Sequence, residues 1–133
     1  MIDAPSIGLW ELLKHARSWL GNLHRAGRTR KLASVTAVRE IVTIARETAV
    51  YLRQINETGK REHATERRLT AGWTNLGFQL KDLGLTKLAK RCQISGKHWS
   101  NPNHFDDEFL RKADVSVERM EKLALDLLNQ IDR

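Results

Sequence analysis

Side chains that commonly bind metal ions or transfer protons gather between residues 92 and 106. Cys92, His98, His104 and Asp106 are all residue types that can hold a transition metal. His98 follows Cys92 by six positions and His104 follows His98 by six more, a spacing that matches no zinc-binding pattern. We therefore expect ordinary surface histidines here, with no metal and no other cofactor.

Arg91 and His98 are a second pair of residues that could take part in catalysis, and six residues separate them in the sequence. This pattern resembles the Arg-x4-6-His signature of HEPN-type ribonucleases, which are also all-helical. The resemblance covers eight residues and implies RNA cleavage, in which Arg91 would hold a phosphate while His98 moves a proton. Cys92 stands where that family usually has a polar residue, and we expect Ser95 and Gly96 to break the helix that carries Arg91.

Elsewhere the sequence shows no nucleophile-and-base pattern and no paired carboxylates of the di-iron type. Cys92 falls on the apolar side of a predicted helix, where a buried structural thiol is far more common than a nucleophile. Gly27, Gly59 and Gly84 are isolated and predict helix ends, not a phosphate-binding loop. A protein without enzymatic activity is therefore the favoured class.

Positive charge is concentrated in two parts of the chain, whose formal net charge is +7 over 133 residues. Residues 1–31 carry six Lys and Arg against two acids, residues 85–104 carry four against none, and residues 105–133 carry five against eight. The candidate nucleic-acid or anion-binding residues are Arg25, Arg28, Arg30, Lys31, Lys87, Lys90, Arg91 and Lys97. If the two clusters meet in the fold they form one surface, and the sequence leaves this open.

Two aromatic residues fall outside the predicted apolar rows and are candidates for a protein contact. These are Trp10, near the start of the chain, and Phe78. Trp10 and the basic end of the same helix also allow a second alternative, a protein that lies on a membrane surface through its first helix. Cys92 is the sole cysteine, and no secretory signal is visible, so we expect a cytoplasmic protein.

Apolar periodicity predicts an all-α fold, an antiparallel up-and-down bundle that forms one domain over residues 1–133. The central helix is expected over residues 32–57, where two neighbouring apolar rows run side by side. Three other main helices are expected over residues 6–24, over residues 61–83 and from residue 114 or 116 onward. A shorter helix is expected near residues 87–93, followed by a turn at residues 100–103 and another short turn at residues 106–108.

These features together predict a small basic helical bundle that acts as a non-enzymatic accessory or adaptor protein. We expect it to bind a protein partner, nucleic acid or both, as an oligomer or within a complex. No small-molecule substrate is evident. The ribonuclease using Arg91 and His98 and the membrane-surface protein remain the alternatives.

Overall fold

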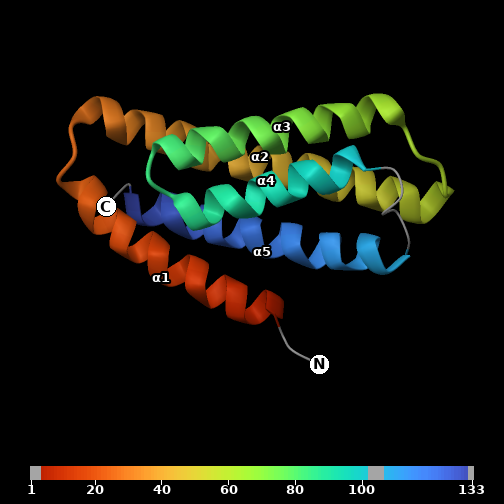
Figure 1. Ribbon diagram of the computed structural model, residues 1–133, viewed down its shortest axis with the longest axis horizontal. Coiled ribbons are helices and arrows are strands. Elements are labelled where there is room, and N and C mark those ends of the chain that lie inside the picture. Colours follow the sequence, from red (N-terminus) through yellow and green to blue (C-terminus); the bar gives the residue numbers. More distant parts are fainter. Residues whose placement is uncertain (1–3, 102–106, 132–133) are drawn as a thin grey trace.

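The computed structural model describes the backbone of residues 4–101 and 107–131, and the side chains of residue 12, residues 14–101 and residues 116–131. Within these ranges the chain is all-helical and has no strand, as predicted. The helices that pack together there are α1 (Ala4–His24), α2 (Arg28–Thr58), α3 (His63–Asp82), α4 (Thr86–Ser100) and α5 (Asp107–Ile131) (Figure 1).

Helix α2 buries the two neighbouring apolar rows that the sequence predicted. Because these rows cover a wide arc of its surface, α2 contacts α1, α3 and α5. It begins four residues before the predicted start, so the basic residues 28–31 form its first turn and are not a connecting loop. Its buried residues are Ser34, Ala37, Val38, Ile41, Val42, Ile44, Ala45, Thr48, Tyr51, Leu52 and Ile55.

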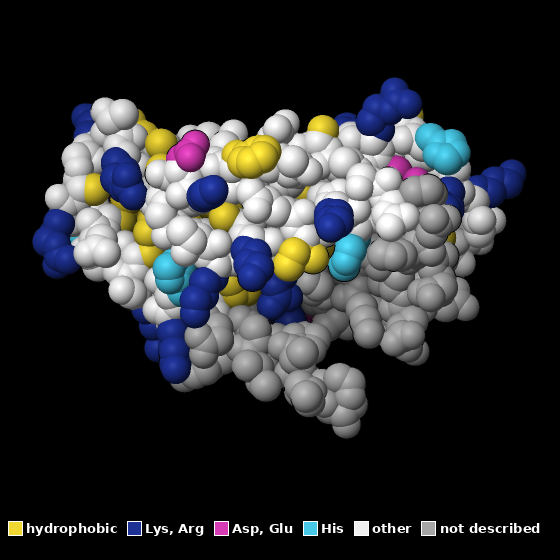
Figure 2. Space-filling view, in the orientation of Figure 1, with side chains coloured by type: hydrophobic (Ala, Val, Ile, Leu, Met, Phe, Trp, Pro, Cys, Tyr) yellow, Lys and Arg dark blue, Asp and Glu magenta, His cyan; other side chains and the backbone are white. Residues whose placement is uncertain are grey.

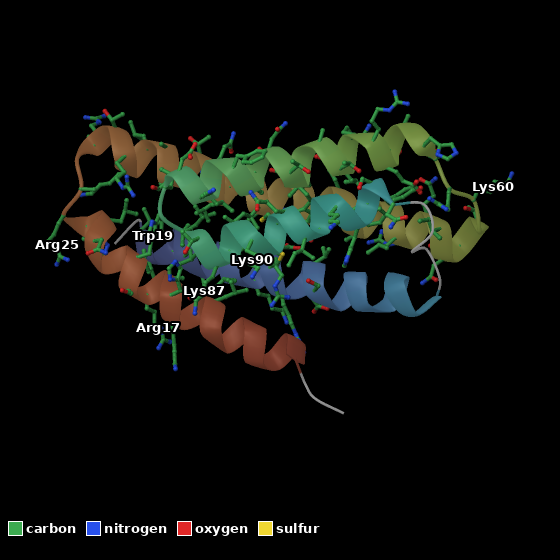
Figure 3. The ribbon with its side chains drawn as sticks, in the orientation of Figure 1. Arg17, Trp19, Arg25, Lys60, Lys87 and Lys90 are labelled. Carbon is green, nitrogen blue, oxygen red and sulfur yellow. The ribbon has the colours of Figure 1, made fainter. Side chains whose placement is uncertain are left out.

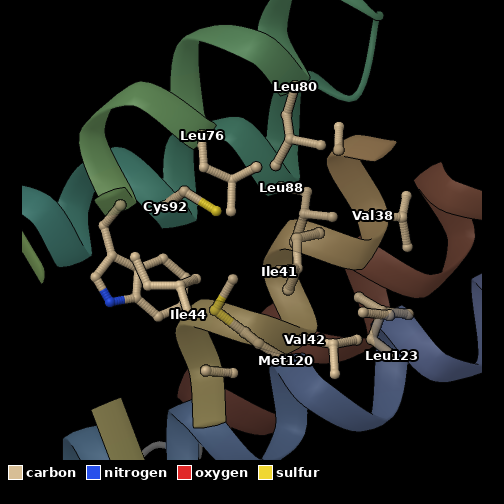
Figure 4. Close-up of a cluster of buried hydrophobic side chains, with 14 of the residues drawn as sticks. Val38, Ile41, Val42, Ile44, Leu76, Leu80, Leu88, Cys92, Met120 and Leu123 are labelled. Atoms are coloured by element: carbon tan, nitrogen blue, oxygen red, sulfur yellow. The ribbon is translucent and has the colours of Figure 1, made fainter. Parts of the chain in front are cut away.

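The hydrophobic core lies where α2 meets α3, α4 and α5 (Figure 4). Leu76 and Leu80 of α3, Leu88 of α4 and Leu123 of α5 pack there against the α2 rows. Trp73 of α3 is fully buried, and its indole nitrogen donates a hydrogen bond of 3.1 Å to Oγ1 of Thr48. This bond pairs two buried polar atoms across α2 and α3.

Cys92 also lies in this core and is fully buried. Burial raises the pKa of its thiol to about 12, because the charged thiolate is costly in an apolar environment. The thiol therefore stays protonated at neutral pH, as expected for a structural cysteine.

Helix α4 spans 15 residues and is longer than the short helix that the sequence predicted. It continues through Ser95 and Gly96, because Gly96 is a contact point with α3 and not a helix break. A Cβ atom at Gly96 would lie 3.1 Å from the backbone nitrogen of Thr74 and 3.3 Å from the carbonyl oxygen of Thr70. Tight packing against α3 thus outweighs the low helix propensity of glycine.

Gly77 of α3 makes the reciprocal close contact with α4. A Cβ atom there would lie 3.1 Å from the carbonyl oxygen of Ala89 and 2.5 Å from Cγ of Gln93. Ala89, near the start of α4, lies beside Gly77 in the later part of α3, and Gly96, near the end of α4, lies beside Thr74 in an earlier part of α3. The two helices are therefore antiparallel. Their backbones approach closely at both glycines.

The end of α3 at Gly84 agrees with the prediction, whereas α5 begins earlier than predicted. Gly84 ends the α3 turn with a left-handed φ of 91°, and the Leu85 amide donates to the Leu80 carbonyl over 2.9 Å, which completes a Schellman motif. Helix α5 begins at Asp107, so the short turn expected at residues 106–108 and the last helix belong largely to one element. Acidic residues at that start favour a helix N-terminus.

A buried polar cluster joins the end of α2 to the start of α3. Glu66 is 6% exposed and accepts hydrogen bonds from Tyr51 Oη at 2.6 Å and from two nitrogens of Arg61, each at 2.8 Å. The Glu62 amide donates to Tyr51 Oη at 2.8 Å. Burial alone would raise the pKa of Glu66, but the hydrogen bonds from Arg61 and Tyr51 outweigh it and hold this pKa below its ordinary value.

Gly96→Ala is expected to lower the free energy of unfolding by about 1–3 kcal/mol, because the added methyl group meets the α3 backbone, which cannot move aside. Urea unfolding followed by circular dichroism measures this. Gly21→Ala is the control, since Gly21 is in α1 with nothing within 4 Å of its Cβ position. That variant is expected to be neutral or more stable by up to about 1 kcal/mol. Equal stability of the two variants would contradict the close α3–α4 contact.

Glu66→Gln is expected to lower the free energy of unfolding at pH 7 by about 1–3 kcal/mol, because the ion pair with Arg61 is lost. A carboxyl with a lowered folded pKa stabilises the protein above its unfolded pKa, and this contribution disappears as the pH falls through the folded pKa. The variant and the natural protein should therefore converge in stability under strongly acidic conditions. Urea unfolding at neutral and acidic pH tests this, and a constant difference would argue against the ionised cluster.

Candidate anion-binding surface

The corner between α1 and α2 is fixed to the turn between α3 and α4 by hydrogen bonds. The carbonyl oxygen of Leu83 accepts from Trp19 Nε1 at 2.8 Å and from Arg30 Nη2 at 2.6 Å. The carbonyl oxygen of Gly84 lies 3.2 Å from His15 Nε2, which therefore carries the proton. These are carbonyl groups that the end of α3 leaves without helical partners. The contacts hold the start of α4 beside α1 and beside the start of α2.

This arrangement brings together two stretches of sequence that contain no acidic residue. Residues 12–39 carry seven Lys and Arg, residues 83–105 carry four, and neither stretch contains Asp or Glu. Figure 3 shows Arg17 of α1 with Lys87 and Lys90 of α4 on the same side of the molecule, and Arg25 at the corner. All four are exposed, and we call them the basic face. Figure 2 shows dark-blue side chains spread over this side, with few magenta ones.

Backbone dipoles add to the positive potential of the basic face. The first turns of α2 and α4 contain no acidic residue, and neither helix has a side-chain cap hydrogen bond at its N-terminus. The partial positive charge of each N-terminus is therefore uncompensated from within its own helix. Both helices begin at the end of the molecule where Leu83 accepts its hydrogen bonds. Anionic groups are attracted to such a surface.

The predicted basic residues do not all lie on this face or share one environment. Arg28 and Lys97 are exposed, but at the first turn of α2 and the last turn of α4. Lys31 is partly buried, and Arg30 donates to Leu83 and so positions the corner. Arg17 was not among the predicted residues. The signal that could have identified Arg17 is its place within residues 12–39, which contain no Asp or Glu.

Arg91 and His98 both lie on α4, which the structure shows to be continuous between them. Seven residues of α-helix complete about two turns, so the two side chains leave the same side of the helix.

Comparison of the chain with protein-family models, with curated proteins and with solved structures gave no significant match. The resemblance to HEPN-type ribonucleases rests on Arg91 and His98. Both side chains are partly buried.

The residues considered for metal binding are not brought together in the part of the chain that the structure describes. Cys92 is buried in the core, whereas His98 is partly exposed. His104 and Asp106 lie outside the described residues. Among the described side chains, no group of three or more His, Cys, Asp or Glu residues could hold a metal ion.

Of the two residues predicted to contact a protein partner, the structure describes the side chain of Phe78 but not that of Trp10. Phe78 lies on α3 and is 55% exposed, as its position outside the apolar row predicted. The side chain of Trp10 lies outside the described residues. Within the described ranges, none of the helices has both the length and the apolar character that crossing a membrane requires.

A hollow of about 520 Å³ lies between α2 and α3, and none of the four residues of the basic face lines it. Its arginines have carboxylate partners, since Arg68 pairs with Glu47 at 3.3 Å and Arg46 with Glu121 at 3.0 Å. The hollow therefore carries no excess charge of the kind found on the basic face.

Proposed function

We propose that this protein binds nucleic acid through the basic face, as a non-enzymatic accessory protein. The observation that carries the proposal is the joining of two acid-free stretches, on α1 and α4, by the hydrogen bonds at Leu83 and Gly84. Exposed Lys and Arg side chains on rigid helices suit a polyanion with closely spaced phosphates. Contacts of this kind give affinity without sequence specificity.

The remaining parts of the proposal concern the scaffold and the setting. We infer that the long helices form an antiparallel up-and-down bundle that acts in the cytoplasm, as an oligomer or within a complex. Phe78, with its exposed aromatic ring, is the proposed contact for a protein partner. Trp10 remains a second proposed contact.

Reversing two charges on the basic face is expected to weaken nucleic-acid binding by at least about tenfold. The variant is Arg17→Glu with Lys90→Glu, and the matched control is Arg53→Glu with Lys60→Glu, since Lys60 lies at the far end of the molecule (Figure 3). Fluorescence anisotropy with labelled single-stranded RNA and duplex DNA, at roughly 50 and 200 mM salt, measures affinity and its salt dependence. For RNA, the slope of log K against log salt should fall in magnitude by about 1.4.

Two results would count against this function. One is the absence of binding to either nucleic acid even at low salt. The other is an equal loss of affinity in the control variant, which would show that net charge and not the basic face determines binding.

The continuity of α4 favours a second candidate function, RNA cleavage by Arg91 and His98. The expected helix break at Ser95 and Gly96 was the main structural objection, and α4 runs unbroken through both residues. In this reading Arg91 would hold a phosphate of the RNA while His98 transfers a proton.

His98→Ala is expected to abolish RNA cleavage, if the natural protein cleaves RNA, without changing its helical content. His24→Ala is the matched control, because His24 is an exposed histidine at the end of α1. Gel analysis of a labelled RNA after incubation provides the measurement. Intact RNA with the natural protein, or cleavage that persists in His98→Ala, would rule out this candidate.

A further inference from the structure

Helices α3 and α4 are in close contact where Gly77 meets Gln93, along a line that we call the α3–α4 seam. A Cβ atom at Gly77 would lie 2.5 Å from Cγ of Gln93, so a larger side chain does not fit between the helices there. The next residue on each helix, Phe78 on α3 and Ile94 on α4, is turned by about 100° around its helix. Phe78 is 55% exposed and Ile94 is 44% exposed. Both therefore lie on the outer side of the α3–α4 seam, away from the core.

Lysine side chains flank these two exposed apolar residues. Lys81 lies one turn after Phe78 on α3. On α4, Lys90 lies one turn before Ile94, and Lys97 lies one turn after it. All three lysines are exposed. Lys90 also belongs to the basic face, so the outer side of the α3–α4 seam is continuous with that face (Figure 3).

Acidic residues are nearly absent from the same part of the chain. Asp82, at the last position of α3, is the one acid between residues 67 and 101, and α4 contains none. Figure 2 shows yellow side chains among dark-blue ones over α3 and α4. An exposed aromatic ring surrounded by positive charge suits a ligand that has a flat apolar part beside an anionic part.

A nucleotide with an unpaired base has both of these properties. The face of the base stacks on an aromatic ring, and the phosphates on either side of it carry negative charge. In a duplex each base is stacked between its neighbours and paired through its edge, so its face is not available to a side chain such as Phe78. A protein surface would need acidic groups placed to match the lysines around the ring, whereas a nucleic acid carries a phosphate beside every base.

We propose that the outer side of the α3–α4 seam binds single-stranded nucleic acid, with an unpaired base stacked on Phe78 and neighbouring phosphates on Lys90 and Lys97. Ile94 adds an apolar contact beside the ring. The proposal rests on the proposed function and adds the class of nucleic acid to it. A base stacked on Phe78 covers the ring that a protein partner would otherwise contact, so the experiment below also decides between these two uses of the ring.

Stacking and charge have different effects on the salt dependence of binding. Lysine contacts to phosphates release counterions, so they determine the slope of log K against log salt. A base that stacks on a ring releases no counterions, so it adds affinity without changing that slope. The preference for single strands should therefore depend on Phe78, whereas part of the salt dependence should depend on Lys97.

Fluorescence anisotropy with one labelled RNA, used as a single strand and annealed to its complement, tests the site. Phe78→Ala is expected to weaken single-strand binding about tenfold, with no change in duplex binding or in the salt slope. Lys97→Gln is expected to reduce the magnitude of the single-strand slope by about 0.7. Val50→Ala is the matched control and should bind like the natural protein, because Val50 is 57% exposed and lines the hollow between α2 and α3.

Two further substitutions at Phe78 separate stacking from simple apolar contact. Phe78→Trp keeps an aromatic face and should bind the single strand at least as tightly as the natural protein. Phe78→Leu keeps an apolar side chain without that face and should lose most of the affinity that Phe78→Ala loses. Full affinity in Phe78→Leu would overturn base stacking. If circular dichroism shows that Phe78→Ala does not fold, the comparison of Phe78→Leu with Phe78→Trp takes its place.

The same measurements separate failure of this site from failure of the proposed function. Single-strand binding that is unchanged in Phe78→Ala but weakened in Arg17→Glu with Lys90→Glu overturns the stacking site. In that case binding by the basic face stands, and the ring of Phe78 is left for a protein contact. Equal weakening of single-strand and duplex binding in Phe78→Ala overturns the preference for an unpaired base. No binding of either RNA by the natural protein, even at low salt, overturns both proposals.

Discussion

The carbonyl oxygens of Leu83 and Gly84 connect the turn between α3 and α4 to helices α1 and α2. A helix leaves its last carbonyl groups without internal partners, and here they accept from Trp19, Arg30 and His15. Two of these donors come from α1 and one from α2, so a single turn holds the ends of both helices. This contact helps to hold Arg17 of α1 on the same side of the molecule as the start of α4. Without it, α1 would meet the rest of the molecule mainly through apolar side chains, which set direction less strictly.

Repulsion on the basic face is offset by interactions in other parts of the molecule. The glycine contacts between α3 and α4 bring two backbones close together and hold α4 firmly. The cluster of Glu66, Arg61 and Tyr51 ties α2 to α3 where charges are fully matched. Carboxylate partners are therefore present where α2 meets α3, whereas the sequence stretches that meet where α1 and α4 lie together contain no Asp or Glu. The exposed positive side chains of Arg17, Lys87 and Lys90 thus lie where a ligand can reach them.

The sequence predicted the helical fold because apolar periodicity is a local property. Both apolar rows of α2 and the helix end at Gly84 were identified correctly, since spacing and glycine conformation fix them. The errors arose where local signals conflict with contacts distant in sequence. Gly96 weakens a helix on propensity alone, but packing against Thr74 of α3 decides its conformation. Residues 28–31 contain no helix breaker and form the first turn of α2, although the predicted helix began at residue 32.

The candidate site was less predictable, because it depends on which helices meet. Charge counting identified Lys87 and Lys90, but the inclusion of Arg17 follows only from the placement of α1 beside α4. Arg30 looked like a binding residue and instead donates to Leu83.

The lack of acidic residues on the basic face also limits how copies of this protein can associate. Two copies that approached through this face would meet like charge with like charge, and neither would offer a carboxylate in return. Self-association through another surface would leave both basic faces accessible. A dimer built in this way is bivalent toward a long polyanion. Once one basic face is bound, the other is held near the same strand at high effective concentration, so modest affinity per face becomes strong binding overall.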